Sequence, residues 1–219
     1  MNLRFFDLIF LFLAVFLQLS YCATIQEVKT VLTKLRETAE DHLHQASLKH
    51  SRMSVEISST ALWTEELGHK QINQKAKKFL AKTRVDKITN HHCKGSRENA
   101  INHIKQTHTE ELVKCVENHA TNSLQLLFEM KSTLSQKVLK GVYEEEKNMV
   151  VCGRSNYLCL DGVVANIKDK IDSLDEIVQD EIDVSLYEVE MQLDIITTCA
   201  FQSILNTDLS LKTISNCTY

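Results

Sequence analysis

The chain of 219 residues contains no proline and only five glycines. Collagen-like and proline-rich chains need these residues in quantity, so both classes are excluded. A sandwich or barrel of many short strands is also disfavoured, because its turns depend on glycine and proline. The formal net charge of −4 provides no overall basic field for nucleic acid, so no nucleic-acid partner is expected. This composition is typical of a protein built from long helices.

Residues 1–22 are predicted to form a secretory signal peptide. Arg4 supplies its positive charge, and an unbroken apolar run of ten residues follows from Leu8. That run is about half of the roughly 20 residues that a membrane-spanning helix needs, although an uncleaved anchor remains the alternative. Ser20 and Cys22 place small side chains before a cut that would leave Ala23 as the first residue. No later segment is apolar enough to span a bilayer, so we expect a secreted, extracellular product without a transmembrane segment.

Removal of the signal peptide leaves an even number of cysteines, which in an oxidising compartment predicts three disulfides. Zinc binding is the alternative, but there is no Cys-x-x-Cys pair, and the gaps do not resemble those of zinc fingers. Asn216 begins the only N-glycosylation sequon, which has a cysteine at its centre and ends one residue before the end of the chain, so its use stays open. The six cysteines are Cys93, Cys115, Cys152, Cys159, Cys199 and Cys217.

The apolar residues recur at helical spacing through most of the chain. The clearest run covers 36 residues at 3.6 residues per step, which indicates a nearly straight amphipathic helix, with Asp161 as its predicted N-cap. A second run begins at Ile25 and continues less regularly through Met53 and Ile57 to Trp63 and Leu67. The clearest run is Val164, Ile167, Ile171, Leu174, Val178, Ile182, Leu186, Val189, Leu193, Ile196 and Ala200.

Glycine is expected to punctuate these helices, because proline is absent. Shorter helices are predicted at about 70–90, 96–140 and 143–151. We therefore expect an all-α fold of long antiparallel amphipathic helices, with N-terminal helices in 23–92 and a disulfide-bonded helical domain in 93–219. The apolar stripe of 96–140 includes Ile101, Ile104, Leu112, Val116, Leu124, Leu127 and Leu134. The glycines at which the apolar pattern breaks are Gly68, Gly95, Gly141, Gly153 and Gly162.

Helix arithmetic ranks the possible disulfide pairings. If 96–151 and 162–206 form an antiparallel hairpin around the Cys152–Cys159 loop, the outer cysteines lie at matching distances from its tip. The sequence separations along the two arms are 37 and 40 residues to the first pair, and 59 and 58 to the second. The bridges predicted in this way are Cys93–Cys217, Cys115–Cys199 and Cys152–Cys159.

Charge is distributed unevenly along the chain. Residues 70–97 hold nine basic residues and one acid, whereas 166–194 hold ten acids and two lysines. Complementary faces help to select packing partners, so these two segments are expected to lie near each other or to be plain solvated faces. The alternative is a basic surface for anionic lipid or glycan.

Two groups of side chains could bind metal. Cys115 and His119 are spaced i, i+4, and His108 lies seven residues before Cys115, so the three could hold zinc if the cysteine were a free thiolate. His91 and His92 could sense pH or bind metal weakly. A disulfide cysteine among partly exposed histidines is the simpler interpretation, so no metal or other cofactor is predicted. No catalytic motif is present, and we expect a protein that is not an enzyme.

The spacing of the cysteines resembles that of a known family. The pattern consists of an earlier pair, Cys93 and Cys115, two central cysteines, Cys152 and Cys159, and a late pair, Cys199 and Cys217. Over residues 90–219 the chain resembles the TsetseEP domain family of secreted insect proteins. The resemblance implies an insect extracellular protein, in a group linked to gut and immune roles, without assigned catalytic residues.

These features together predict a secreted, non-enzymatic extracellular protein that is a monomer or a weak oligomer. It would act through an unidentified protein or glycan partner, in gut or immune defence or in a reproductive secretion. The alternative is a carrier of small hydrophobic ligands. A cavity above about 300 Å³ between the helices would favour the carrier, and a solid core would favour the interaction protein.

Overall fold

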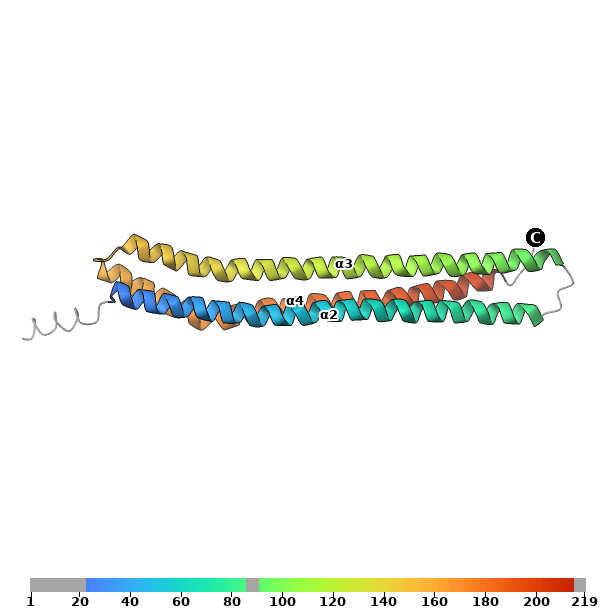
Figure 1. Cartoon of the computed structure of the whole chain (residues 1–219), viewed down its shortest axis with the longest axis horizontal. Helices are drawn as coiled ribbons and strands as arrows, with labels where there is room; N and C mark the ends of the chain where they lie inside the picture. The colour runs from blue at the N-terminus through green and yellow to red at the C-terminus, as the bar shows by residue number, and fades with distance from the viewer. Residues whose placement is uncertain (1–22, 86–90, 215–219) are drawn as a thin grey trace, which may run out of the picture. The chain divides into compact units, whose positions relative to one another are not determined.

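The protein forms three long α-helices. A computed structural model describes residues 23–85 and 91–214, and for 83–85 and 91–96 it describes the backbone alone. The predicted all-α fold is confirmed, because no strand occurs in these described ranges. In the same ranges no helix is both long enough and apolar enough to cross a bilayer. The helices are α2 (Ile25–Val85), α3 (His91–Cys152) and α4 (Tyr157–Ile214), as labelled in Figure 1.

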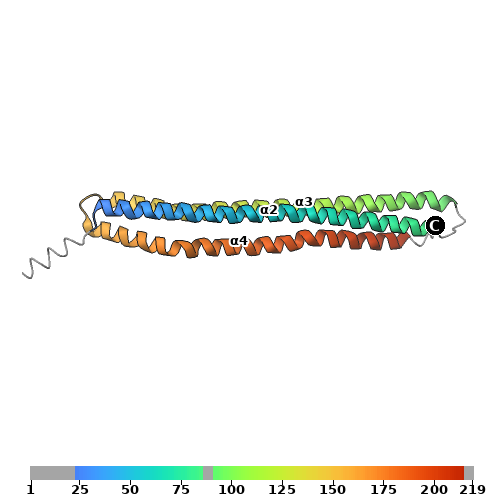
Figure 2. The ribbon, with the colours of Figure 1, turned by 60° about the horizontal axis from the view of Figure 1, so that its bottom comes forward.

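The chain divides into two compact units, and each unit contains a part of all three helices. Unit 1 consists of Met1–Leu48 and Lys131–Ile182, and unit 2 consists of Lys49–Met130 and Asp183–Tyr219. Within each unit the segments of α2, α3 and α4 lie side by side, as both Figure 1 and Figure 2 show.

The core of unit 1 follows the predicted apolar spacing closely. Its α2 segment buries apolar residues at the predicted helical spacing, and the α4 segment does the same from Leu160 onward. The direction of the helices follows from two contacts, since Ala23 meets Asp161 and His42 lies beside Asp175, so α2 and α4 run in parallel. The buried residues include Val28, Leu32, Leu35, Ala39, Leu134, Val138, Val142, Leu160, Ile167, Leu174, Val178 and Ile182.

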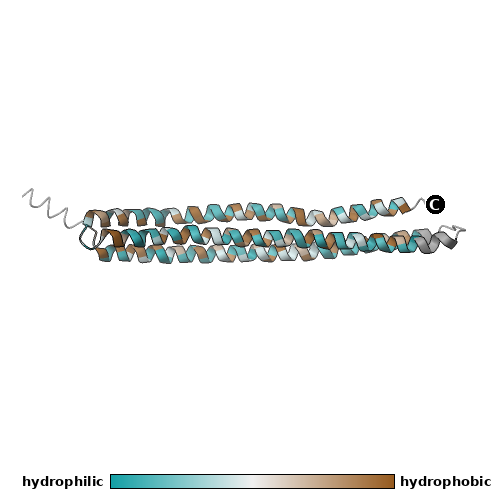
Figure 3. Cartoon of the chain, turned by 90° about the horizontal axis from the view of Figure 1, so that it is seen from above, coloured by the Kyte–Doolittle hydropathy of each residue, from teal (hydrophilic) through white to brown (hydrophobic). Residues whose placement is uncertain are grey.

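The core of unit 2 differs from the prediction at three places. At each one, a large apolar residue that was expected inside is exposed, and its polar neighbour in the sequence is buried instead. Trp63 is 55% exposed while Thr64 is 0% exposed. The same exchange occurs between Leu124 at 36% and Ser123 at 1%, and between Leu186 at 38% and Ser185 at 1%. Figure 3 shows how apolar and polar residues alternate along the helices.

The small side chains of α2 explain one of these exchanges. Ala61, Thr64 and Gly68 are all buried, and their spacing of three and four puts them on one face of the helix. Small residues let another helix approach closely: a Cβ added at Gly68 would overlap the side chain of Leu112 on α3. Trp63 is too large for this face, so the helix turns Thr64 inward and leaves the indole outside.

The predicted breaks at four glycines are wrong, because the helices continue through Gly68, Gly95, Gly141 and Gly162. The separate helices predicted at 96–140 and 143–151 are parts of α3, and the one predicted at 70–90 is part of α2 as far as Val85, beyond which it lies outside the described residues. One glycine within a helix costs about 1 kcal/mol relative to alanine, which the packing of a helix of about 60 residues outweighs. Gly153 does end a helix, since its φ of 66° is a left-handed conformation that other residues rarely adopt.

The predicted N-cap of the last helix is also wrong. The helix α4 begins at Tyr157 rather than after Asp161, and Asn156 caps it: the Asn156 Oδ1 atom accepts a hydrogen bond of 3.3 Å from the Cys159 amide. Asp161 lies within the second turn of α4. Its side chain accepts a hydrogen bond from the backbone nitrogen of Ala23 instead.

Two of the three predicted disulfides are present. Cys115–Cys199 joins α3 to α4 in unit 2 with a Cα–Cα distance of 5.9 Å, and Cys152–Cys159 closes the turn between the same helices in unit 1 at 5.5 Å. The antiparallel arrangement of these two helices is therefore confirmed. The predicted Cys93–Cys217 bridge stays a prediction, because the side chain of Cys93 and the whole of Cys217 lie outside the described residues. Asn216 lies outside them too.

Candidate functional site

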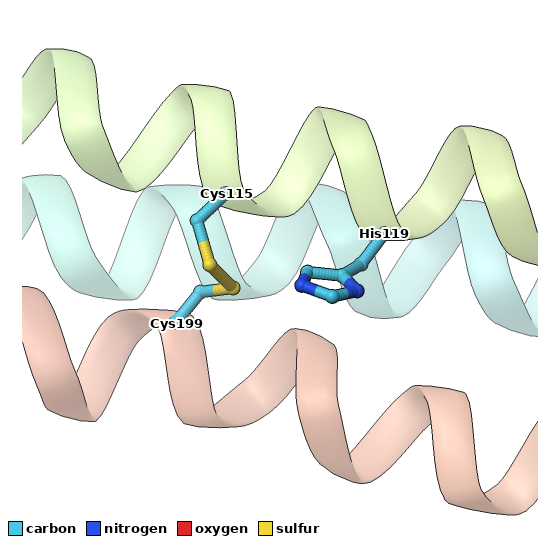
Figure 4. A group of neighbouring side chains, drawn as sticks. All are labelled: Cys115, His119 and Cys199. Carbon is cyan, nitrogen blue, oxygen red and sulfur yellow. A yellow bond between two sulfur atoms is a disulfide. The ribbon is translucent and has the colours of Figure 1, made fainter.

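A histidine lies beside the disulfide of unit 2. His119 follows Cys115 by one helical turn on α3, and Figure 4 shows its ring next to the bridge to Cys199. The potential ligand atoms of these three residues all lie within 4.8 Å of one another. A cysteine binds metal as its thiolate, so the oxidised bridge offers no cysteine ligand. The reduced pair would supply two thiolates beside the His119 imidazole.

The predicted third member of this cluster is occupied elsewhere. The His108 Nδ1 atom lies 2.8 Å from the Glu111 carboxylate, and its Nε2 atom lies 3.0 Å from the Ser210 hydroxyl. Cys199 of α4 takes the place that the spacing assigned to His108. The prediction missed Cys199 because spacing within one helix carries no information on the neighbouring helix. The side chains of His91 and His92 lie outside the described residues, so their role stays a prediction.

Unit 1 contains a half-open cavity of about 260 Å³ between its helices. Its volume is slightly below the roughly 300 Å³ at which ligand-binding clefts usually begin. Polar residues also border it, among them Lys137, Lys140 and Lys170. Its apolar lining consists of Leu35, Val138, Gly141, Val142, Leu174 and Ile177.

An ion pair between half-buried Lys170 and a buried carboxylate borders this cavity. The Lys170 amine lies 2.8 Å from Glu145 Oε1 and 3.3 Å from Glu144 Oε2, and it also donates to the Gly141 carbonyl oxygen at 3.3 Å. The side chain of Glu145 is only 3% exposed, so Lys170 compensates a carboxylate that has little access to water. This pair was not predicted, because nothing in the sequence distinguishes Glu145 from its neighbours in the Glu144–Glu146 run.

The surroundings of Lys170 stabilise its charged form. Burial by itself lowers the pKa of this amine, but the hydrogen bonds and the charges of Glu145 and Glu144 outweigh that effect and raise the pKa above its usual value. The amine therefore stays charged through the physiological range. A permanently charged lysine held by carboxylates serves as a structural group and is poorly suited to act as a general base or a nucleophile.

An apolar surface lies on α4 in unit 2, and we call it the α4 ridge. The residues Val184, Tyr187, Met191 and Ile195 are 56%, 62%, 40% and 39% exposed, and their spacing of three, four and four puts them on one face. Exposed Glu190 and the neighbouring acids lie alongside the ridge. Single exposed apolar residues are ordinary, but a contiguous row of them is typical of an interaction surface.

The ion pairs of the two charged segments run to other parts of the chain. In unit 2, Lys75 of the basic segment lies 3.0 Å from Asp208, and the hydrogen bond from Lys75 is the main cause that lowers the pKa of this carboxyl. In unit 1, Asp175 of the acidic segment lies beside His42, and Glu181 pairs with Lys137. The ion pairs described thus do not follow the predicted pairing of 70–97 with 166–194.

The chain matches no protein-family model, no curated protein and no solved structure. The resemblance to the TsetseEP domain family therefore stays a prediction. Three features remain as candidates for function: the α4 ridge, the cavity of unit 1 and the cluster of His119 with the disulfide.

Proposed function

We propose that the protein is a secreted, non-enzymatic helical protein that binds an extracellular protein through the α4 ridge. The observation that carries this proposal is the row of exposed apolar side chains that forms the ridge, at 56%, 62%, 40% and 39% exposure. A helix that served only its own core would bury its large apolar residues and expose polar ones. Exposing the large apolar side chains costs free energy in the isolated chain, and that cost is recovered when a partner covers them.

The chemistry of the ridge favours one kind of partner. Aliphatic and aromatic side chains with acids alongside suit an amphipathic helix that carries basic residues at its edge. A glycan, by contrast, presents hydroxyl groups that the aliphatic members of the ridge cannot hydrogen-bond. Disulfides persist in oxidising compartments, so the two bridges support the proposed secretion.

Secretion is tested by expressing the full chain in a secretory cell line. We expect the protein in the medium with no titratable thiol. Retention inside the cells, or free thiols in the secreted native protein, would contradict the proposal.

The ridge is tested by capture from extracellular fluid with an immobilised protein. Met191→Lys is expected to abolish capture of the partner, because it places a charge in the middle of the apolar surface. Val55→Lys is the matched control: Val55 is 68% exposed on α2 of the same unit and is not part of the ridge. Equal capture by the two variants, with unchanged helix content, would refute the role of the ridge.

The carrier of small hydrophobic ligands is the second candidate. The cavity of unit 1 is where such a ligand would bind, and its volume of about 260 Å³ lies below the roughly 300 Å³ that would favour a carrier. Gly141→Leu would fill the cavity, since Gly141 lines it and an added Cβ would meet only the Lys170 side chain, at 3.9 Å. Gly162→Leu is the matched control, because that glycine has open space around it and does not line the cavity. A fluorescent apolar probe that Gly141→Leu displaces and Gly162→Leu does not would favour the carrier over the interaction protein.

A further inference from the structure

The backbone nitrogen of Ala23 has a charged acceptor. It lies 2.5 Å from the Asp161 Oδ1 atom of α4, and the two residues are 138 positions apart in the sequence. Ala23 is 3% exposed and Asp161 is half-buried, so this contact is partly buried. The two residues belong to unit 1, and the contact links the first residues of α2 to the second turn of α4.

The position of this nitrogen is fixed by the helix that follows it. Thr24 caps α2: its hydroxyl accepts a hydrogen bond of 3.2 Å from the Glu27 amide, and its carbonyl accepts one of 3.1 Å from the Val28 amide. Ala23 directly precedes this cap. Its nitrogen is therefore held between the α2 cap and the Asp161 carboxylate.

A neutral backbone amide needs only an uncharged hydrogen-bond acceptor, whereas the acceptor beside this nitrogen is a charged carboxylate. The first turn of a helix concentrates partial positive charge, so an ammonium placed directly before α2 would be destabilised unless an anion lay beside it. Asp161 is that anion. Ala23 is also the residue that the small side chains of Ser20 and Cys22 mark as the first of the secreted chain.

We propose that cleavage of the Cys22–Ala23 bond creates an N-terminal ammonium that Asp161 binds, so that processing adds an ion pair between α2 and α4. A signal endopeptidase would use one water molecule: the hydroxyl goes to the Cys22 carbonyl carbon and the proton to the Ala23 nitrogen as the peptide bond breaks. The new carboxyl group then gives up its proton, and the Ala23 amine takes up a proton to become an ammonium. The amide had one N–H donor and no charge, whereas the ammonium has three donors and a full charge. The cleavage rests on the proposed secretion, while the role of Asp161 rests on the contact itself.

A double-mutant cycle tests the ion pair in the mature chain of residues 23–219. One form begins with a free Ala23, and the other carries a Gly-Ser extension that keeps the neutral amide at the same atom. Each form is made with Asp161 and with Asp161→Asn, and unfolding in urea is followed by circular dichroism. The free amine is expected to lower the unfolding equilibrium constant by about three- to tenfold, and Asp161→Asn is expected to remove that difference.

Asp169→Asn is the matched control, since it makes the same change of charge at an exposed position on α4. It should leave the difference between the free and extended chains intact. A free chain no more stable than the extended one, or a difference that survives Asp161→Asn, would overturn the assignment of Asp161.

The first residue of the secreted protein, read by mass spectrometry, tests the cleavage. A start at Ala23 supports the proposal, and any other start overturns it while leaving the proposed function intact. Failure of secretion overturns the proposed function and the cleavage together. Secretion without coupling to Asp161 overturns the ion pair alone.

Discussion

The two disulfides should differ in their contribution to stability, because they close loops of very different length. Cys115 and Cys199 are 84 residues apart, whereas Cys152 and Cys159 are only seven apart. A disulfide stabilises a protein mainly by restricting its unfolded chain, and the loss of entropy grows with the logarithm of the loop length. The chain-entropy relation gives about 4.5 kcal/mol for the long loop and about 2.4 kcal/mol for the short one.

The difference of about 2 kcal/mol is the quantity to measure. Both double variants, Cys115→Ala with Cys199→Ala and Cys152→Ala with Cys159→Ala, lose one bridge and leave small apolar side chains. Cys199 and Cys152 are 2% and 8% exposed, so the loss of buried surface is comparable in the two variants and largely cancels in the comparison. The free energy of unfolding is obtained from urea titrations followed by circular dichroism, with the linear extrapolation to water.

A suitable background removes the remaining two cysteines. Replacing Cys93 and Cys217 by serine in every variant prevents a further bridge between them. Such a bridge would close a loop of its own and reduce the difference in unfolding free energy between the two double variants. The m-value should also rise more in the variant without the long loop, because its unfolded chain exposes more surface. An equal loss of stability in both variants, or a greater loss without the short loop, would refute the reasoning.

Three further predictions follow from single positions. Gly68→Ala should destabilise unit 2 by about 1–2 kcal/mol, because the Cβ of the new alanine would overlap buried Leu112. Gly162→Ala should instead stabilise the protein by about 0.5–1 kcal/mol in the same urea assay. Lys170→Met should cost about 2–3 kcal/mol, because buried Glu145 would lose its charged partner and keep the hydrogen bond from Asn148. Recovery on additional replacement by Glu145→Leu would confirm that cause. The raised pKa of Lys170 adds stability that is fully present below its unfolded value of about 10.4 and is lost as the pH rises through the folded pKa. Unfolding titrations above that pH should therefore show a smaller further loss in Lys170→Met than in the wild-type protein.

The fold class and the helix pairing could be predicted from the sequence, because they depend on properties that repeat along one chain. The helical spacing from Val28 to Ala39 predicted which face is buried in unit 1. The nearly equal intervals between cysteines predicted the antiparallel register and the bridges Cys115–Cys199 and Cys152–Cys159. Both inferences use only the rise and the period of the helix, which are the same wherever a helix lies.

The candidate sites depend on which residues of different helices meet, and spacing within one helix says nothing about that. The sequence placed His108 with Cys115 and made Asp161 a cap, whereas the tertiary structure puts Cys199 beside His119 and gives Asp161 to the Ala23 nitrogen. Small residues around Thr64 turned a polar side chain inward, against the apolar pattern, because close approach between helices is limited by side-chain volume as well as by polarity. Composition and period thus determined a disulfide-linked set of helices, and packing between the helices decided which of their side chains remain available to a partner.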